Sequence, residues 1–263
     1  MASRVARRKE ADASRPTRSE AQPSEGRQPE RERVASAKAR HGVRSAAEFV
    51  PPRPTLERLR AAAQGCRGCD LYRNATQAVM GEGPQRSRIV LVGEQPGDKE
   101  DRAGHPFVGP AGRLLDRALG LAGFERKDAY VTNAVKHFKW RAGRGKLRIH
   151  AKPDAREVRA CRPWLEAELA LVGPDAVVAL GATAARSLFG PAARVMKQRG
   201  QVFESEWARC SSMTVHPSAL LRIPEEEDRH AAFDAFVRDL CAVRRALGQR
   251  QRTKQPMHAG SIL

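Results

Sequence analysis

Residues 88–98 read RIVLVGEQPGD, an unbroken apolar run that ends in a loop of glycine, proline and acidic residues. A run without polar alternation is typical of a parallel strand that is covered on both faces. Glycine after such a strand exposes backbone N–H groups and lets a ligand come close. We therefore interpret this stretch as a buried strand followed by a candidate binding loop, although an ordinary strand-to-helix turn would look the same from these residues alone.

Three further stretches have the character of strands, and helical patterns lie between them. The candidate strands are AYVTNAV at 129–135, AVVALG at 176–181 and SMTVH at 212–216. Apolar residues recur at helical spacing in 112–121, 154–171 and 233–247. This alternation predicts a three-layer α/β/α domain with a central, mainly parallel four-stranded sheet, which we place at residues 54–248.

The segments that flank this domain are polar and basic. Residues 1–53 and 249–263 contain few large apolar side chains, so we predict two disordered tails. The formal net charge of the chain is +18, and half of it falls on the predicted domain. Such a basic domain indicates a polyanionic partner, most commonly nucleic acid. A genome that favours arginine codons is the alternative explanation.

The sequence also indicates a compartment. No run approaches the ~20 apolar residues of a membrane span, and the start, MASRVARRKEADASRP, is charged where a secretory signal is apolar. We expect a cytoplasmic protein with no membrane association. In that setting the pair Cys66-x-x-Cys69, with further cysteines downstream, indicates a metal or redox site before it indicates disulfides.

Polar motifs follow three of the predicted strands, at the edge where parallel α/β sheets bind their ligands. They are GEQPGD at 93–98 with GHPFVGP at 104–110, TNAVKH at 132–137, and HPSALLR at 216–222. A single histidine at a strand end, such as His216, is more often structural than catalytic. All three motifs in this order are much harder to explain by chance.

Together the motifs GE-x-PG, G-x-PFVGPAG, TN-x-VK, LG-x-x-A, RG and HPS resemble family 4 of the uracil-DNA glycosylase superfamily, over about residues 66–240. GEQPGDKED with a basic loop after TNAVKHFK is similar to the UdgX class, which bonds covalently to DNA at uracil sites. That class reads KRRIH where this chain reads KLRIH, so Leu147 departs from the pattern. The resemblance implies a monomeric DNA-repair enzyme that acts on uracil-containing, preferentially single-stranded DNA.

The resemblance also implies roles for individual residues. Phe107 would stack on the flipped-out uracil, and Asn133, a donor and acceptor at once, would read its edge. Gln95 and Asp98 would help to hold the base, and His216 would face the uracil O2 and stabilise the charge of the leaving base. The implied DNA-binding residues are Lys146, Arg148, Ser218, Leu220, Leu221 and Arg222; Arg148 would anchor a phosphate, and a residue of 220–222 would wedge into the vacated base stack.

A metal site is the next implication. Family 4 proteins hold a 4Fe–4S cluster, and the resemblance assigns it here to Cys66, Cys69 and Cys161. His137 stands where family 4 places its fourth cysteine, so we expect it to be the fourth ligand. The same set of three cysteines and a histidine suits a structural zinc ion, which the residues alone would favour.

His150 is the candidate nucleophile. Loss of uracil leaves an oxocarbenium-like C1′, which water normally captures. This chain lacks the water-activating aspartate that directly follows GQ in the best-known family, whereas its inserted loop offers the imidazole of His150. We predict that His150 bonds to C1′, with Glu94 holding its other ring nitrogen. The alternatives are a family 4 enzyme that releases free uracil with turnover, and a non-catalytic DNA-binding module.

Overall fold

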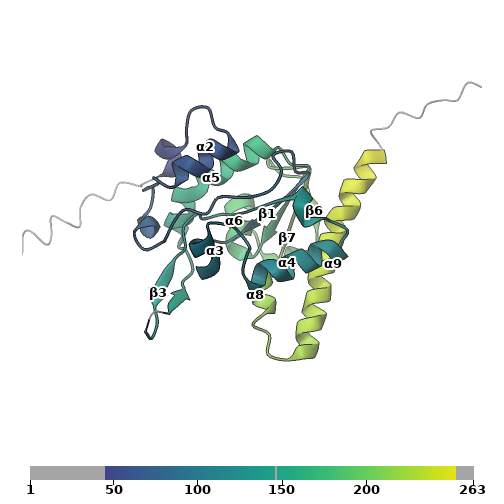
Figure 1. Cartoon of the computed structure of the whole chain (residues 1–263). Coiled ribbons are helices and arrows are strands. Elements are labelled where there is room, and N and C mark those ends of the chain that lie inside the picture. Colours follow the sequence, from purple (N-terminus) through teal and green to yellow (C-terminus); the bar gives the residue numbers. More distant parts are fainter. Residues whose placement is uncertain (1–44, 146, 253–263) are drawn as a thin grey trace, which may run out of the picture. The chain divides into compact units, whose positions relative to one another are not determined.

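The computed structural model of the chain describes residues 45–145 and 147–252. Its central sheet has five strands in the order β2-β1-β5-β7-β6, of which the first four are parallel (Figure 1). The strands are β1 (Ile89–Gly93), β2 (Ala129–Asn133), β5 (Ala176–Leu180), β6 (Val202–Phe203) and β7 (Cys210–Thr214). The four predicted strands are confirmed. The edge strand β6, which runs antiparallel to β7, is too short to leave a pattern in the sequence.

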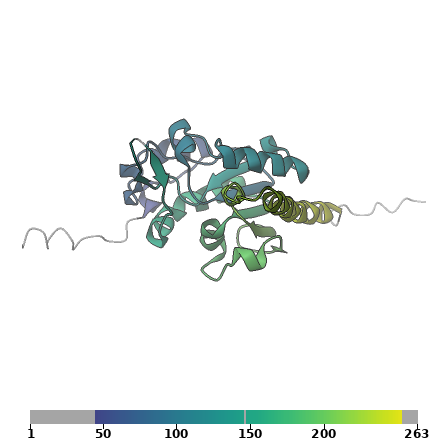
Figure 2. The same cartoon turned by 90° about the horizontal axis from the view of Figure 1, so that it is seen from below.

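Helices cover both faces of the sheet, as Figure 2 shows from below. Successive residues of a strand face opposite sides. Leu91 and Val178 therefore pack with α4 (Pro110–Leu121) and α9 (Glu226–Arg252) on one face. Their neighbours Val90 and Val177 pack with α5 (Ala155–Val172) and α6 (Ala182–Phe189) on the other. This confirms the predicted three-layer α/β/α architecture and explains why the strands are apolar without alternation.

Short elements complete the domain. They are η1 (Ala46–Phe49), α2 (Leu56–Ala63), η2 (Asp70–Arg73), α3 (Asp98–Ala103), η3 (Arg126–Asp128), α7 (Val195–Gln198) and α8 (Pro217–Leu220). Within the described ranges, no helix combines the length and the apolar character that crossing a membrane requires.

The folded part extends beyond both predicted boundaries. Element η1 lies inside the predicted N-terminal tail, because Ala46 is buried against a cluster that includes Leu59 and Trp164. At the other end α9 continues to Arg252, through glutamine and arginine residues that favour helix. The remainder of the predicted tails, residues 1–44 and 253–263, lies outside the described residues.

The inserted loop between β2 and α5 forms a two-stranded ribbon. Its strands β3 (Trp140–Ala142) and β4 (Arg148–His150) pair antiparallel, with Trp140 opposite His150. In Figure 1 this ribbon, labelled β3, extends away from the central sheet. His150 stands at its base, where the ribbon rejoins the domain. The position is thus set by strand pairing rather than by a flexible loop.

Candidate active site

A cavity of about 140 Å³ opens at the carboxyl edge of the parallel sheet. Its walls come from the loops after β1 and β2, from the segment before α4, and from α8. The residues that line it include Gln95, Phe107, Asn133, His150, His216 and Arg222. Apolar cavities of about 150 Å³ hold one benzene-sized ring. The cavity therefore has the dimensions for a single six-membered ring.

Phe107 and Asn133 meet in this cavity above Gly93. A Cβ atom at Gly93 would lie 2.3 Å from Asn133 Oδ1 and 2.7 Å from Phe107 Cζ, so only glycine fits there. Phe107 itself has a φ of 59°, which is strained for a residue with a side chain. Its carbonyl oxygen is so close to Gly112 that a Cβ there would lie 1.5 Å away. The two glycines thus hold an aromatic face and an amide against one small space.

A buried ion pair supports Asn133 from behind. The Lys136 ammonium donates to Asn133 O at 2.6 Å, to Thr132 Oγ1 at 2.8 Å and to Glu168 Oε2 at 2.6 Å, which uses all three protons. Glu168 also accepts from the hydroxyl groups of Thr132 and Tyr130. Lys136 and Glu168 are both inaccessible to solvent. This network fixes the end of β2, while the Asn133 side-chain amide has no hydrogen bond to another described residue.

His216 presents an N–H group to the cavity. Its Nδ1 accepts from the backbone N–H of Ser218 at 3.2 Å and lies 2.8 Å from the Ser218 hydroxyl. Because a backbone N–H can only donate, Nδ1 is unprotonated and Nε2 carries the proton. Burial lowers the pKa of His216 to about 4, and the neighbouring His150 and Arg222 act in the same direction. The imidazole is therefore neutral near pH 7 and acts as a donor through Nε2.

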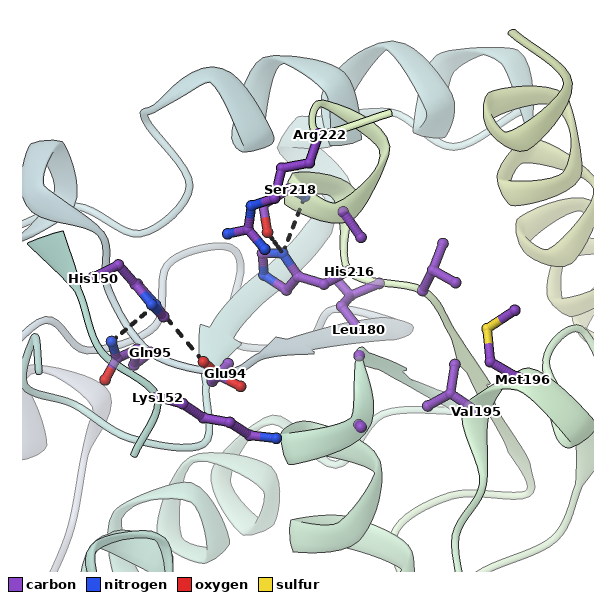
Figure 3. Close-up of a pocket in the computed structure, with 14 residues that line it drawn as sticks. Glu94, Gln95, His150, Lys152, Leu180, Val195, Met196, His216, Ser218 and Arg222 are labelled. Carbon is purple, nitrogen blue, oxygen red and sulfur yellow. Dashed lines mark hydrogen bonds and ion pairs between the residues drawn. The ribbon is translucent and has the colours of Figure 1, made fainter. Parts of the chain in front are cut away.

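Gln95 ties the ribbon to the domain and sets the tautomer of His150. Gln95 Oε1 accepts from the Lys139 N–H at 3.1 Å, while Gln95 Nε2 lies 3.1 Å from the carbonyl oxygens of Lys139 and Ala151. The same nitrogen lies 2.9 Å from His150 Nε2 (Figure 3). An amide nitrogen only donates, so His150 Nε2 carries the lone pair and Nδ1 the proton. Gln95 lines the cavity, but these contacts favour a role in holding the ribbon over the predicted contact with the base.

Glu94 lies beside the same ring nitrogen. Its Oε1 is 3.7 Å from His150 Nε2, and its other carboxylate oxygen accepts from the Thr183 hydroxyl (Figure 3). We predicted that Glu94 would hold the opposite nitrogen, and the geometry instead turns it toward the nitrogen with the lone pair. Burial lowers the pKa of His150; Glu94 opposes this shift and Arg222 adds to it. The His150 imidazole is thus neutral near pH 7 and, with its side chain 41% exposed, accessible.

Arg148 is a clamp for the ribbon. It pairs with Asp98 at 2.5 Å and with Asp101 at 2.6 Å, and its guanidinium carbon lies 5.3 Å and 5.6 Å from the ring centres of Phe138 and Trp140. With 11% of its side chain exposed, it has little surface left for a phosphate. These contacts favour a structural role for Arg148 and Asp98 over the predicted contacts with DNA and uracil.

Fewer residues can act as the wedge in the base stack than we predicted. Leu220 lies in the core with 2% of its surface exposed and cannot enter a base stack without unfolding α8. Leu221 is 45% exposed, and Arg222 is exposed at the cavity rim. Ser218 is the partner of His216. Lys146, the remaining predicted DNA contact, lies outside the described residues.

The predicted metal ligands converge in part. Cys66, Cys69 and Cys161 belong to one buried cluster, and N–H groups approach two of the sulfurs: Lys136 N lies 3.2 Å from Cys161 Sγ, and Trp164 Nε1 lies 3.3 Å from Cys66 Sγ. His137 is buried, one residue after Lys136. In the described part of the chain, no group of three or more histidine, cysteine or acidic side chains meets the geometry for a metal ion. The donor chemistry and the N–H groups directed at sulfur nevertheless suit an iron–sulfur cluster.

Two residues of the site carry no recognisable signal in the sequence. Glu100 is buried beside the cavity, and its carboxylate accepts from the Gly109 N–H at 2.7 Å, which joins α3 to the loop that carries Phe107. Thr183, at the start of α6, orients Glu94. Glu100 stands among other acidic residues of α3, and Thr183 in an alanine-rich helix start. Only the folded geometry distinguishes them.

Comparisons with known proteins agree with this geometry. The family model described as "Uracil DNA glycosylase superfamily" matches residues 80–241. The chain is 38% identical over 181 residues to the "Type-4 uracil-DNA glycosylase" of Thermotoga maritima, covering 68% of this chain and 90% of the relative. A protein of the same description from Pyrobaculum aerophilum is 35% identical over 176 residues, 64% of this chain and 86% of its own. One from Archaeoglobus fulgidus is 31% identical over 194 residues, with coverages of 71% and 94%.

Proposed function

The chain belongs to the uracil-DNA glycosylase superfamily, and from this membership and the geometry of the site we propose that it removes uracil from DNA by cleaving the N-glycosidic bond. The observation that carries the proposal is the ring-sized cavity where Phe107, Asn133 and His216 meet. An enzyme that works on a base must extrude it, and pocket contacts must offset the unstacking cost. The Phe107 face would stack on the base, and the unpaired Asn133 amide would supply a donor and an acceptor.

His216 would stabilise the leaving base. When the C1′–N1 bond breaks, both electrons leave with uracil, whose oxygens take up negative charge. The neutral imidazole directs its Nε2–H into the cavity and keeps that orientation through Ser218. A fixed donor in a site of low dielectric constant stabilises charge that develops there. His216 would therefore act as an oxyanion donor rather than as a general acid.

We further propose that His150 captures the sugar, as the UdgX class does. The Gln95 amide has two protons, and three acceptors surround it: the carbonyl oxygens of Lys139 and Ala151, and His150 Nε2. If His150 Nε2 gives up this hydrogen bond, both amide protons still have an acceptor. The Nε2 lone pair would then bond to the electron-poor C1′, and the Nδ1 proton would pass to water. Glu94, beside Nε2, would stabilise first the sugar cation and then the charged imidazole.

A turnover enzyme is the second candidate. The relatives that are 31–38% identical carry the name Type-4 uracil-DNA glycosylase, which describes release of the base rather than capture of the sugar. The two candidates share the cavity and the role of His216. They differ only in what happens at C1′. The fate of the DNA therefore separates them.

We propose that Cys66, Cys69, Cys161 and His137 hold a 4Fe–4S cluster. When bound, such a cluster ties these distant segments together and exchanges electrons. The backbone N–H of Lys136 would stabilise the sulfur of Cys161, and the indole N–H of Trp164 that of Cys66. A structural zinc ion on the same residues is the alternative.

Release of free uracil tests the function. Purified protein in excess over a uracil-containing oligonucleotide should release one uracil per strand, and Asn133→Ala should slow this about ten- to a hundredfold, since an unpaired base edge costs ~1–3 kcal/mol. The measurement is single-turnover release of labelled uracil. No release by the parent protein would leave a DNA-binding module, and equal rates for parent and Asn133→Ala would refute the assignment of the base pocket.

Metal analysis tests the cofactor. Anaerobically purified protein should be brown and contain roughly four iron atoms per chain, as expected for a cubane cluster. Cys161→Ala should lose the iron, and His137→Cys should keep it. Cys210→Ala is the matched control, because Cys210 is equally buried but lies in the core beside α9. One zinc ion per chain without iron would contradict the assignment.

A further inference from the structure

A second groove leaves the candidate active site between α5 and α6. The groove has a volume of about 520 Å³. A separate open pocket of about 430 Å³, drawn in Figure 3, shares His150 and His216 with the ring-sized cavity. Lys152 lines both, so the two spaces adjoin. Figure 3 shows Lys152 among the residues that line the pocket of His150 and His216. Among the groove residues, Thr183 alone is placed in the site described above, where it orients Glu94.

The groove is positively charged. Lys152, Arg159, Arg162 and Arg186 line it, and among the described residues Asp154 is the one acidic side chain that does so. The Asp154 carboxylate is engaged in capping α5, where it accepts two backbone N–H bonds. Arg162 pairs with glutamates, whereas Lys152, Arg159 and Arg186 have no ion pair with another described residue. Three cations without an ion-pair partner outweigh the single carboxylate of Asp154, and this excess of positive charge favours an anionic occupant.

A buried hydroxyl points to the same occupant. Ser187 lines the groove with 6% of its surface exposed, and its Oγ has no hydrogen-bond partner among the described residues. A buried hydroxyl without a partner is destabilising, and native proteins seldom retain one. A ligand oxygen in the groove would supply the missing partner after a rotation of the side chain.

We propose that this groove binds the sugar–phosphate backbone of the DNA strand that leaves the uracil pocket. Arg159, Arg186 and Lys152 would lie against phosphates, and Ser187 would donate a hydrogen bond to one of them. The inference rests on the proposed function, since the occupant is the same DNA. Helix α6 starts directly after β5, so one end of the groove lies at the sheet edge that holds the cavity. A positively charged groove that follows one sugar–phosphate backbone is typical of proteins that bind single-stranded nucleic acid without sequence preference. We therefore expect the occupant to be a single strand.

Salt dependence of binding tests the groove separately from catalysis. The probe is a single-stranded oligonucleotide with 2′-fluoro-2′-deoxyuridine, whose fluorine disfavours the sugar cation and keeps the bond intact. Arg159→Ala with Arg186→Ala should reduce the slope of log affinity against log salt by about 1.4, or about 0.7 for each phosphate that the protein no longer neutralises. Arg238→Ala with Arg245→Ala is the charge-matched control on α9, across the sheet, and should leave the slope unchanged. An unchanged slope in the groove variant, or an equal loss in the control, overturns the proposal.

Two further readouts sharpen the result. The first compares probes that extend only 5′ or only 3′ of the analogue. The groove leads away from one side of the pocket, so the groove variant should bind only one of these two probes more weakly than the parent does. Equal weakening for both probes overturns the proposal. Ser187→Ala should weaken probe binding roughly tenfold without lowering the melting temperature. A lower melting temperature with unchanged affinity would assign the hydroxyl to the fold. Uracil release by the parent is scored independently, so failure of the proposed function remains distinguishable.

Discussion

Replacing His150 with alanine should abolish the denaturant-resistant complex that the parent protein forms one-to-one with a uracil-containing oligonucleotide. The reason is specific to this imidazole: because Gln95 Nε2 donates to His150 Nε2, that nitrogen carries the lone pair that would bond to C1′, and it lies 3.7 Å from Glu94 Oε1. Without it, water is the remaining nucleophile for C1′. The variant should therefore release uracil slowly and leave abasic DNA, which a denaturing gel with and without alkali measures.

His230→Ala is the matched control, since His230 is an exposed histidine on α9 and no part of the cavity. It should form the complex at the parental rate. The rate of capture should also follow the charge of His150. Burial lowers its pKa, so the nucleophilic neutral form persists below the usual range of imidazole and capture declines only on stronger acidification. A complex that survives His150→Ala would place the nucleophile elsewhere and reject the UdgX interpretation of the ribbon.

The positions of the residues at the strand ends can be predicted from the sequence, because the parallel sheet determines them. Residues at the carboxyl ends of β1 and β2 must be neighbours once the strands are parallel and in register, and Gly93 does lie opposite Asn133. Phe107, Asn133, His150 and His216, which the motifs single out, all line one cavity. The residue types alone, glycine and asparagine at strand ends, indicate where backbone and side chain approach a ligand.

The predictions that differ from the structure concern residues whose role depends on tertiary partners. In the sequence Arg148 resembles a DNA-binding arginine. In the structure Asp98, Asp101 and two aromatic rings surround its guanidinium group. In the sequence Leu220 and Leu221 are equivalent candidates for the wedge. Because successive residues of a helix point in different directions, Leu220 lies in the core and Leu221 faces solvent. No periodicity in the sequence indicates such partners, because they come from segments far apart in the chain.

Lys136→Met should be among the most destabilising single substitutions in the domain. It leaves Glu168 buried with no counter-ion, and removing one member of a buried ion pair costs ~3–5 kcal/mol. Chemical denaturation of the purified protein measures the decrease in the free energy of unfolding. Lys127→Met is the control, because the Lys127–Glu125 pair is fully exposed and should leave the midpoint unchanged.

The double variant Lys136→Met with Glu168→Gln separates the stabilising role of this pair from its effect on the site. It removes both charges and keeps an amide oxygen that can accept from Gly81 N–H and the Tyr130 hydroxyl, so much of the lost stability should return, and the cycle should show a coupling energy of at least ~1 kcal/mol. The Asn133 carbonyl, however, still lacks the ammonium that holds it at 2.6 Å. Uracil release should therefore remain slow in a protein that is again stably folded, because the Asn133 amide, which we propose reads the base, has lost its support. Parental rates in the stable double variant would mean that the pair serves the fold alone.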